Sequence, residues 1–276
     1  MNSISVNGKI SDAAKPALLV SNRGYRYGDG LFETMKFAEG KIVLETFHFE
    51  RLFNSLELLK FKIPQLFTIE KLRQEILTLT RKNKCEQLAR VRLSVFRGHG
   101  GLYENDKDKE PQYIIECWPL SESINNPNEN GFIIDIYPIA KKSTDIFSNL
   151  KTANFLPYAM AALYAKENKL NECLVLNTAG NIADATISNL FIIKDQMILT
   201  CALSQGCVNG VMRRNILESG LFVKETIITE EDLLLADEVF LTNAISGIRW
   251  VKQFRDKTYN NDETIKIYDR IIKNSQ

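Results

Sequence analysis

The sequence has few histidines and no long apolar run. Its 276 residues include two histidines, His48 and His99, and the absence of other ligands at suitable spacing argues against a zinc site. The longest apolar runs are strand-sized, such as Phe132–Ile134, and are too short to cross a bilayer. We therefore expect no metal site and no contact with the membrane interior.

An excess of charge of one sign is also absent. Thirty-five basic residues face 34 acidic residues, so no global field attracts nucleic acid or an anionic membrane. The five cysteines are odd in number and widely spaced, which is typical of reduced cytosolic thiols and unlike a disulfide framework. The start, Met1–Lys9, indicates a short strand and turn and not a signal peptide. We expect a cytoplasmic protein.

The overall composition is that of a globular protein, with 45% hydrophobic and 25% charged residues. The length suits one large domain or two smaller ones. Residues 119–131 are polar, include two prolines and a glycine, and have no apolar period. We predict a linker at 119–131, between a smaller N-terminal domain (1–118) and a larger C-terminal domain (132–276).

The apolar spacing predicts the main elements. In the first domain it predicts strands at 31–37, 41–45, 89–96 and 112–118, and helices at 48–60 and 68–82. In the second it predicts helices at 157–166, 211–219, 231–235 and 263–273, and strands at 172–177, 182–194, 197–201 and 239–242. A glycine-rich loop, Arg97–Tyr103, precedes the strand at 112–118. Because strands and helices do not alternate long enough for a doubly wound sheet, the fold class is α+β with antiparallel or mixed sheets.

Lys151 lies between an expected strand and an expected helix, with uncharged neighbours from Ser148 to Pro157. An amine that is partly desolvated in such a place has a lowered pKa and a lone pair available for imine chemistry. An ordinary surface lysine is the more common explanation of the position alone. The case for chemistry at Lys151 therefore depends on residues elsewhere in the chain.

Two features indicate a site for a phosphate. The segment Ser204–Arg214 brings two glycines and Asn209 directly before a helix, where main-chain N–H groups and the helix dipole attract an anion. A loop with an asparagine cap is the simpler alternative. Arg51, near the start of the helix at 48–60, is a candidate phosphate clamp if a partner lies elsewhere, although an arginine there usually faces solvent.

Asp184 lies in a β-rich run of small and apolar residues, 182–191. A carboxylate among such neighbours is costly unless it is paired. It either faces solvent on a half-exposed strand or holds a protonated pyridine nitrogen, the partner that pyridoxal phosphate chemistry requires. A lysine for an imine, an acid for a ring nitrogen and a phosphate site together indicate a pyridoxal phosphate enzyme.

These residues, in this order, resemble the fold-type IV pyridoxal phosphate enzymes: branched-chain and D-amino acid aminotransferases and aminodeoxychorismate lyases. The motifs that carry the resemblance span nearly the whole chain: Asn22–Thr34, His48–Leu52, Lys151–Asn154, Gly180–Phe191, Gly206–Arg213 and Thr242–Ala244. The resemblance implies a two-domain fold, with a smaller N-terminal α/β domain and a larger C-terminal domain of mixed, barrel-like sheet that carries the Schiff-base lysine. It also implies a homodimer, with the active site near the dimer interface.

The resemblance implies a role for each matching residue. Lys151 is the Schiff-base lysine and proton shuttle, Asp184 faces the ring nitrogen, and Thr34 is a candidate proton-donating or orienting hydroxyl. The expected cofactor contacts are Arg51, Lys151, Asp184, Ser188, Asn189, Val211, Met212, Thr242 and Asn243, with main-chain groups of Val211 and Met212 at the phosphate. The expected substrate contacts are Phe32, Arg92, Arg97 and Arg249, the arginines because the substrate of the lyases is a dicarboxylate.

Two residues depart from the family pattern. Asp184 stands where the family usually has glutamate, which is one methylene longer, and Met212 stands where many aminotransferases have a hydroxyl residue. The segments Val208–Arg213 and Arg97–Gly101 resemble those of the lyases more than those of the aminotransferases. We therefore predict a 4-amino-4-deoxychorismate lyase that forms pyruvate and 4-aminobenzoate for folate synthesis. A branched-chain or D-amino acid aminotransferase remains open, as does a cofactor-binding homologue without activity.

Overall fold

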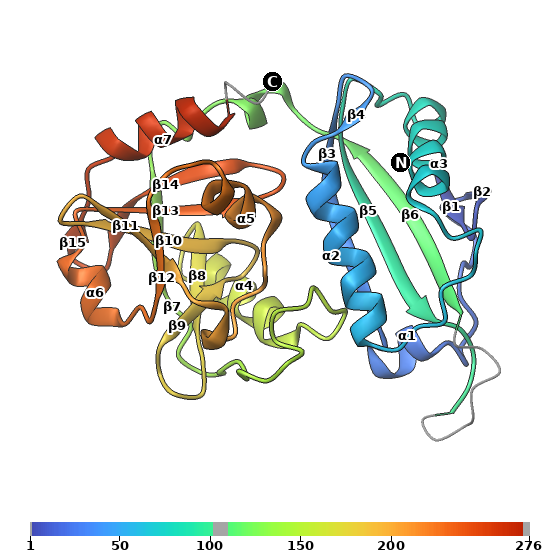
Figure 1. Cartoon of the computed structure of the whole chain (residues 1–276), viewed down its shortest axis with the longest axis horizontal. Helices are drawn as coiled ribbons and strands as arrows, with labels where there is room; N and C mark the ends of the chain where they lie inside the picture. The colour runs from blue at the N-terminus through green and yellow to red at the C-terminus, as the bar shows by residue number, and fades with distance from the viewer. Residues whose placement is uncertain (1, 102–109, 273–276) are drawn as a thin grey trace. The chain divides into compact units, whose positions relative to one another are not determined.

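The computed structural model describes residues 2–101 and 110–272. Leu102 and Tyr103 of the glycine-rich loop, and Lys273 of the expected closing helix, lie outside the described residues. The chain forms two compact units (Figure 1). Unit 1 comprises Met1–Glu122 and Lys151–Asn154, and unit 2 comprises Ser123–Leu150 and Phe155–Gln276.

Unit 1 is built on a six-stranded antiparallel sheet in the order β2-β1-β6-β5-β3-β4. Its strands are β1 (Ser3–Val6), β2 (Lys9–Asp12), β3 (Gly30–Ala38), β4 (Lys41–Ile42), β5 (Leu88–Arg97) and β6 (Pro111–Pro119). Its helices are α1 (Arg23–Tyr27), α2 (Glu45–Leu58) and α3 (Ile69–Lys82). The two helices predicted here are confirmed. The strand predicted at 41–45 is shorter than expected, because Leu44 adopts a left-handed conformation (φ 56°) and α2 begins directly after it.

One face of this sheet is covered by α2 and α3 (Figure 1). In α3 the apolar residues Leu72, Ile76 and Leu79 recur at helical spacing and are fully buried. Strand side chains alternate between the two faces of a sheet. Glu33 therefore points toward α2, while its neighbours Phe32 and Thr34 point to the opposite face.

The segment Lys151–Asn154 pairs with the edge of β3. The Phe32 N–H donates to the Lys151 carbonyl at 2.9 Å, and the Ala153 N–H donates to the Gly30 carbonyl at 2.9 Å. Strand β4 pairs with the other end of β3, at Phe37 and Ala38, so the first residues of this edge can accept the segment. The expectation that the C-terminal domain carries Lys151 is therefore corrected, because main-chain pairing places Lys151 in unit 1.

Unit 2 contains a nine-stranded mixed sheet in the order β12-β11-β10-β13-β14-β7-β8-β9, with β15 paired to β14. Its strands are β7 (Phe132–Ile136), β8 (Glu172–Leu176), β9 (Ile182–Ala185), β10 (Asn189–Lys194), β11 (Met197–Cys201), β12 (Val223–Thr226), β13 (Glu238–Asn243), β14 (Gly247–Phe254) and β15 (Lys257–Thr258). Its helices are α4 (Leu156–Glu167), α5 (Val211–Glu218), α6 (Glu230–Leu235) and α7 (Asp262–Ile272). The four helices predicted in this part of the chain are confirmed.

A large apolar cluster in the core of unit 2 draws side chains from strands across the sheet. It includes Ile136, Leu174, Ile182, Leu241 and Val251. Because residues from β7, β8, β9, β13 and β14 share this cluster, the sheet curls around it. Short 3₁₀ helices occur at Glu122–Asn125 and Leu203–Gln205.

Two sequence expectations differ from the structure of unit 2. The strand predicted at 182–194 is two strands, β9 and β10, because the chain turns where the Ala185 N–H bonds the Ser188 carbonyl at 2.8 Å. Strands β12, β14 and β15 were not predicted, and the region of β7 was noted only as a strand-sized apolar run. The boundary between the units, after Glu122, falls within the predicted linker at 119–131.

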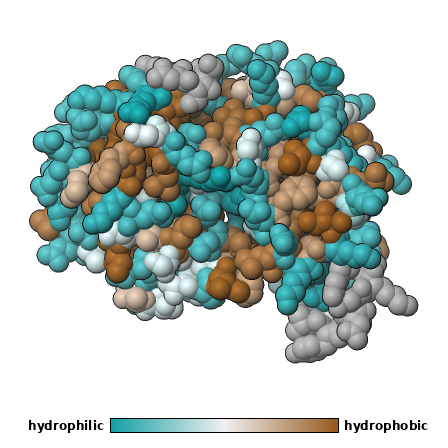
Figure 2. All heavy atoms as spheres, viewed as in Figure 1, coloured by the Kyte–Doolittle hydropathy of each residue, from teal (hydrophilic) through white to brown (hydrophobic). Residues whose placement is uncertain are grey.

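Two general features bear on the kind of protein. Among the described residues, no helix has the length and hydrophobicity needed to span a membrane. The same residues contain no cluster of three or more histidine, cysteine or acidic side chains suited to a metal ion. On the face drawn in Figure 2, polar residues are interspersed with smaller groups of apolar residues.

Candidate functional site

The residues expected at the site fall in both units. Unit 1 contains Phe32, Thr34, Arg51, Arg92, Arg97 and Lys151. Unit 2 contains Asp184, Ser188, Asn189, Val211, Met212, Thr242, Asn243 and Arg249.

In unit 1, Lys151 and Phe32 are neighbours through both main chain and side chain. The Lys151 ammonium lies 4.5 Å from the centroid of the Phe32 ring, a distance at which a cation is attracted to the face of an aromatic ring. The guanidinium carbon of Arg92 lies 3.8 Å from the centroid of the same ring. Lys151 is half-buried. The structure thus brings together three residues that were expected at the site.

Arg51 is held by a buried acid. Its Nε and Nη2 donate to the two carboxylate oxygens of Glu33 at 2.8 and 2.6 Å, a bidentate pair that fixes the plane of the guanidinium. The Nδ1 of His48 lies 2.6 Å from the same carboxylate. Burial alone raises the pKa of Glu33, but Arg51 and His48 outweigh it and bring the pKa to about 2. Glu33 therefore stays ionised and orients Arg51.

Glu33 and His48 were not identified as site residues from the sequence. Both are buried, and the Nε2 of His48 has no hydrogen-bond partner among the described residues. The available signal was an acidic residue at a core-facing position of a strand, because such a residue requires a partner.

Phe32 and Arg92 line a cavity of about 380 Å³ on the sheet face opposite α2. Ser94 and Glu116 also line it, and the Arg92 Nε lies 3.2 Å from the Ser94 hydroxyl. Burial lowers the pKa of Arg92, although Glu116 acts in the opposite direction. Thr34 is half-buried and lies opposite Arg92 in the pairing of β3 with β5. The cavity can accept a carboxylate at Arg92 and a flat ring against Phe32.

Arg97 and Arg249 do not line this cavity. The Nη1 of Arg97 bonds Asp29 at 2.6 Å, and its guanidinium lies over the Phe61 ring. The guanidinium of Arg249 donates to the carbonyls of Asn126 and Ile124 at 2.6 and 2.8 Å. These contacts hold loops in place. A substrate role for either arginine stays a prediction that these contacts do not support.

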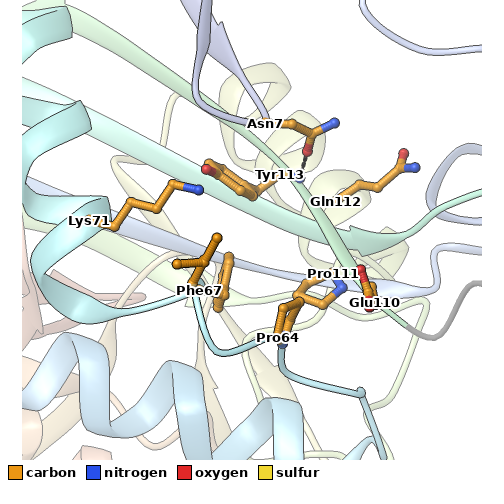
Figure 3. A pocket seen from close by; sticks show the side chains of 9 residues that line it. Asn7, Pro64, Phe67, Lys71, Glu110, Pro111, Gln112 and Tyr113 are labelled. Carbon is orange, nitrogen blue, oxygen red and sulfur yellow. Dashed lines mark hydrogen bonds between the residues drawn. The ribbon is translucent and has the colours of Figure 1, made fainter.

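A second cavity of unit 1, of about 250 Å³, is lined by Phe67, Lys71 and Tyr113 among others (Figure 3). The Tyr113 N–H donates to the Asn7 side chain at 2.8 Å, and the Tyr113 hydroxyl donates to Glu75 at 2.8 Å. The polar groups of Tyr113 are thus used within the protein. None of the residues expected at the site lines this cavity.

In unit 2, the start of α5 is shaped to receive an anion. No side chain among the described residues caps this helix, and the N–H groups of its first turn have no partner within the helix. The Asn189 amide donates to the Val208 carbonyl at 2.8 Å and holds the preceding turn. Thr242 pairs with Asn189 across β10 and β13. Its hydroxyl is buried without a hydrogen-bond partner in the described part of the chain.

Further asparagines build the loop before α5. The Asn149 side-chain amide donates to the carbonyls of Leu203 and Cys207 at 2.8 and 2.7 Å. The main-chain carbonyl of Asn149 accepts the Asn209 N–H at 3.0 Å. Asn177 donates to the Gln205 carbonyl at 3.1 Å. Sequence reasoning missed Asn149 and Asn177, because a loop asparagine by itself gives no specific signal.

Asp184 is 2% exposed and fully paired. Its carboxylate accepts the Tyr158 hydroxyl at 2.9 Å on each oxygen, the Val208 N–H at 2.9 Å and the Lys142 ammonium at 3.3 Å. Burial first, and the Asp184 charge second, raise the pKa of Tyr158 well above its ordinary value, so the phenol remains a donor. The alternative that Asp184 faces solvent is therefore wrong.

Ser188 and Asn243 are linked to a buried acid that the sequence did not reveal. The Asn243 amide lies 3.2 Å from the Ser188 hydroxyl, which in turn lies 3.3 Å from a carboxylate oxygen of Glu172. Burial raises the pKa of Glu172 to about 7. The side-chain oxygen of Asn243 also accepts the N–H groups of Ile245 and Ser246 and thereby shapes that turn.

Comparisons with known proteins place these residues in a wider context. The amino-transferase class IV family model matches residues 30–254. An aminodeoxychorismate lyase of Bacillus subtilis is 30% identical over 256 residues, which are 89% of this chain and 84% of the relative. A D-alanine aminotransferase of Bacillus licheniformis is 25% identical over 247 residues, which are 88% and 84% of the two chains.

The same architecture occurs in a branched-chain aminotransferase of Thermoproteus uzoniensis, solved with norvaline. The TM-score is 0.87 at 21% identity, over 99% of this chain and 95% of the other. This likeness confirms the predicted fold-type IV architecture.

Proposed function

Since this chain belongs to the amino-transferase class IV family, we propose that it is a 4-amino-4-deoxychorismate lyase that releases pyruvate and 4-aminobenzoate. The observation that carries the proposal is the cavity in which Arg92 and the Phe32 ring lie together. A guanidinium binds a carboxylate and an aromatic face binds a flat ring, and the proposed substrate offers both. The likeness to the Bacillus subtilis lyase supports the same choice.

The cofactor is pyridoxal phosphate, and the described residues fit it. The uncapped start of α5 and the unpartnered Thr242 hydroxyl suit a phosphate. When bound, the cofactor supplies a carbonyl that condenses with the substrate amine and a ring that accepts electrons from the bond being broken.

The expected cofactor residues of each unit then have a defined task. Arg51, oriented by Glu33, and the N–H groups of Val211 and Met212 bind the phosphate. Asp184 would bind the ring nitrogen, while Ser188, Asn189 and Asn243 shape the surrounding turns. A hydroxyl side chain at position 212 is not needed for this task, because the main-chain N–H groups of Val211 and Met212 supply the donors for the phosphate.

Lys151 holds and moves the proton. Its amine would hold the cofactor and would act as the base that moves a proton at the substrate. The adjacent Phe32 ring, whose centroid lies 4.5 Å from the Lys151 nitrogen, limits where this amine can move. Thr34 is proposed to orient the proton that is delivered to the substrate.

The substrate carboxylate binds Arg92, whose orientation is set by Ser94. Loss of the enolpyruvyl group is favoured because the remaining ring becomes aromatic. The proposal places this enzyme in folate synthesis, as a homodimer in the cytoplasm. Light scattering on the purified protein tests the dimer, which a mass near 31.5 kDa would contradict.

An aminotransferase acting on a branched-chain or D-amino acid is the second candidate. It uses the same lysine and cofactor, and the likeness to the Bacillus licheniformis D-alanine aminotransferase favours it. A homologue that binds the cofactor without catalysis is the third, because of Asp184 and Met212. The pairing of Asp184 with several donors speaks against the third candidate.

One set of assays separates these candidates. Pyruvate release from 4-amino-4-deoxychorismate is measured beside transamination of leucine or D-alanine with 2-oxoglutarate. We expect pyruvate release, and we expect Lys151→Ala to abolish it together with the visible band of the bound cofactor. Transamination without pyruvate release would reject the lyase, and turnover by Lys151→Ala would show that another residue is the reactive lysine.

A further inference from the structure

Tyr158 places its hydroxyl on the carboxylate of Asp184. The hydroxyl lies 2.9 Å from both carboxylate oxygens, and it comes from α4, whereas Asp184 comes from β9. Both residues belong to unit 2. A neutral phenol that donates to an ionised acid forms a charge-assisted hydrogen bond, which is stronger than one between neutral groups.

Lys142 completes the contact from a second direction. Its ammonium donates to the Tyr158 hydroxyl and lies 3.3 Å from an Asp184 oxygen. The main chain of Lys142 is itself fixed, because its N–H bonds the Leu176 carbonyl at 2.8 Å and its carbonyl accepts the Thr178 N–H at 3.0 Å. The lysine, phenol and acid therefore form a connected chain of polar contacts in a buried place.

The same acid is tied to the turn that precedes α5. The Val208 N–H donates to Asp184 at 2.9 Å, and the Val208 carbonyl accepts the Asn189 amide at 2.8 Å. The position of the acid is thus coupled to the position of the turn. An aspartate has a short side chain with little reach of its own, so its neighbours decide where its oxygens lie.

We propose that Tyr158 is a positioning residue that fixes the Asp184 carboxylate against the ring nitrogen of bound pyridoxal phosphate. Lys142 holds the Tyr158 hydroxyl in place for this task. The inference rests on the proposed role of Asp184 and does not depend on whether the enzyme is a lyase or an aminotransferase.

The first test compares Tyr158→Phe with Tyr164→Phe. Tyr164 lies on the same helix and packs its ring against Tyr137 at 5.7 Å, and its hydroxyl makes no hydrogen bond within the described residues. We expect Tyr158→Phe to weaken pyridoxal phosphate binding about tenfold, the loss typical of one charge-assisted hydrogen bond. It should also alter the visible absorption band of the bound cofactor and lower kcat more than it raises KM.

Tyr164→Phe should leave all three quantities unchanged. Thermal melting without cofactor should fall for Tyr158→Phe, because its hydroxyl bonds the buried Asp184 carboxylate, and should stay at the wild-type value for Tyr164→Phe. Equal cofactor affinity and an equal visible band in Tyr158→Phe and the wild type would overturn the proposal.

A double-mutant cycle with Asp184→Glu gives a second, independent test. In the presence of the Tyr158 hydroxyl the longer acid is crowded, so Asp184→Glu alone should weaken cofactor binding. In Tyr158→Phe the hydroxyl is gone, and the added methylene should recover most of the lost affinity. An equal effect of Asp184→Glu in both backgrounds would overturn the proposal.

The tests of Tyr158 and the assay of the proposed lyase activity can fail independently of each other. Failure of the wild type to release pyruvate would reject the lyase and leave the cofactor measurements to decide on Tyr158. Unchanged binding in Tyr158→Phe, with normal pyruvate release, would reject the positioning role alone.

Discussion

Two buried glutamates of this chain differ because of what surrounds them. Glu33 lies between Arg51 and His48 and has a pKa of about 2. Glu172 faces hydroxyl groups such as that of Ser188 at 3.3 Å, and burial raises its pKa to about 7. The charge of one acid is thus balanced at neutral pH, whereas the other is most stable when protonated.

Replacing Glu172 with glutamine should stabilise the protein at high pH. The folded-state pKa of about 7 is above the ordinary value of 4.5, so the contribution of this acid to stability is fully present below pH 4.5 and is lost as the pH rises through 7. Urea denaturation should show little difference at pH 4.5. At pH 8 the variant should gain at most about 3 kcal/mol over the wild type.

The exposed Glu231, in the first turn of α6, offers a matched control, and Glu231→Gln should bring no gain in stability at pH 8. A benefit of Glu172→Gln that is the same at pH 4.5 and pH 8 would show that Glu172 is not buried as a neutral acid.

Single residues divide clearly into those that the sequence could reveal and those that it could not. Lys151, Arg51 and Asp184 lie in recognisable motifs. Tyr158 and Lys142 acquire their meaning from contacts with Asp184 across 26 and 42 positions of the chain. Such contacts exist only after folding, and no local pattern encodes them.

At the scale of elements, the start of α5 depends on the glycine before it. Gly210 has an ordinary φ of −67°, so the reason for glycine is space and not backbone conformation. A Cβ at this position would lie 1.9 Å from the Oδ1 of Asn189. Any side chain would therefore displace the amide that holds Val208.

Gly210→Ala should lower pyridoxal phosphate affinity at least about tenfold and destabilise the fold by about 1–3 kcal/mol. Cofactor titration and urea denaturation measure the two effects. Gly40→Ala is the control, because Gly40 has a φ of +80° and open space around it: it should cost stability without affecting cofactor binding. Cofactor affinity equal to that of the wild type in Gly210→Ala would show that the turn does not contribute to the site.

Elements with a regular apolar period were predicted well, and interrupted ones were not. Helices α2 and α3 bury residues at helical spacing and match the prediction to within a few residues. Strand β14 was missed because the charged Arg249 occupies a buried position. Its hydrogen bonds to the carbonyls of Asn126 and Ile124 offset the cost of removing the guanidinium from water. A charged residue in the core breaks the alternation by which a strand is recognised.

At the scale of the whole molecule, the chain passes between the units after Glu122, after Leu150 and after Asn154. The first passage lies in a segment whose polar composition predicted a linker. The second and third passages lie on either side of the four residues Lys151–Asn154. A return to unit 1 of only four residues leaves no signal in the composition of the sequence. Its placement follows from the open edge of β3 and was not predictable from the sequence.

Loosening unit 2 should therefore release main-chain contacts in unit 1. Leu241→Ala removes a buried side chain from the core of unit 2 and should destabilise that unit by about 2–5 kcal/mol. The Phe32 N–H bonds Lys151, which is flanked by unit 2 on both sides, whereas the Val43 N–H bonds Lys36 within unit 1. Hydrogen exchange should accelerate more at Phe32 than at Val43. Equal acceleration at both amides would contradict the expectation.

The main-chain pairing of the Lys151 segment with β3 also bears on how genes of this family can recombine. In the gene, the codons of Lys151–Asn154 lie between two stretches that encode unit 2. The edge of β3 with which this segment pairs is encoded more than a hundred codons earlier. The hydrogen bonds that join Gly30 and Phe32 to this segment are made by main-chain atoms, so they do not depend on which side chains either parent supplies. In a chimera that takes its first 122 residues from one family member and the rest from another, the lysine segment should still pair with the edge of β3.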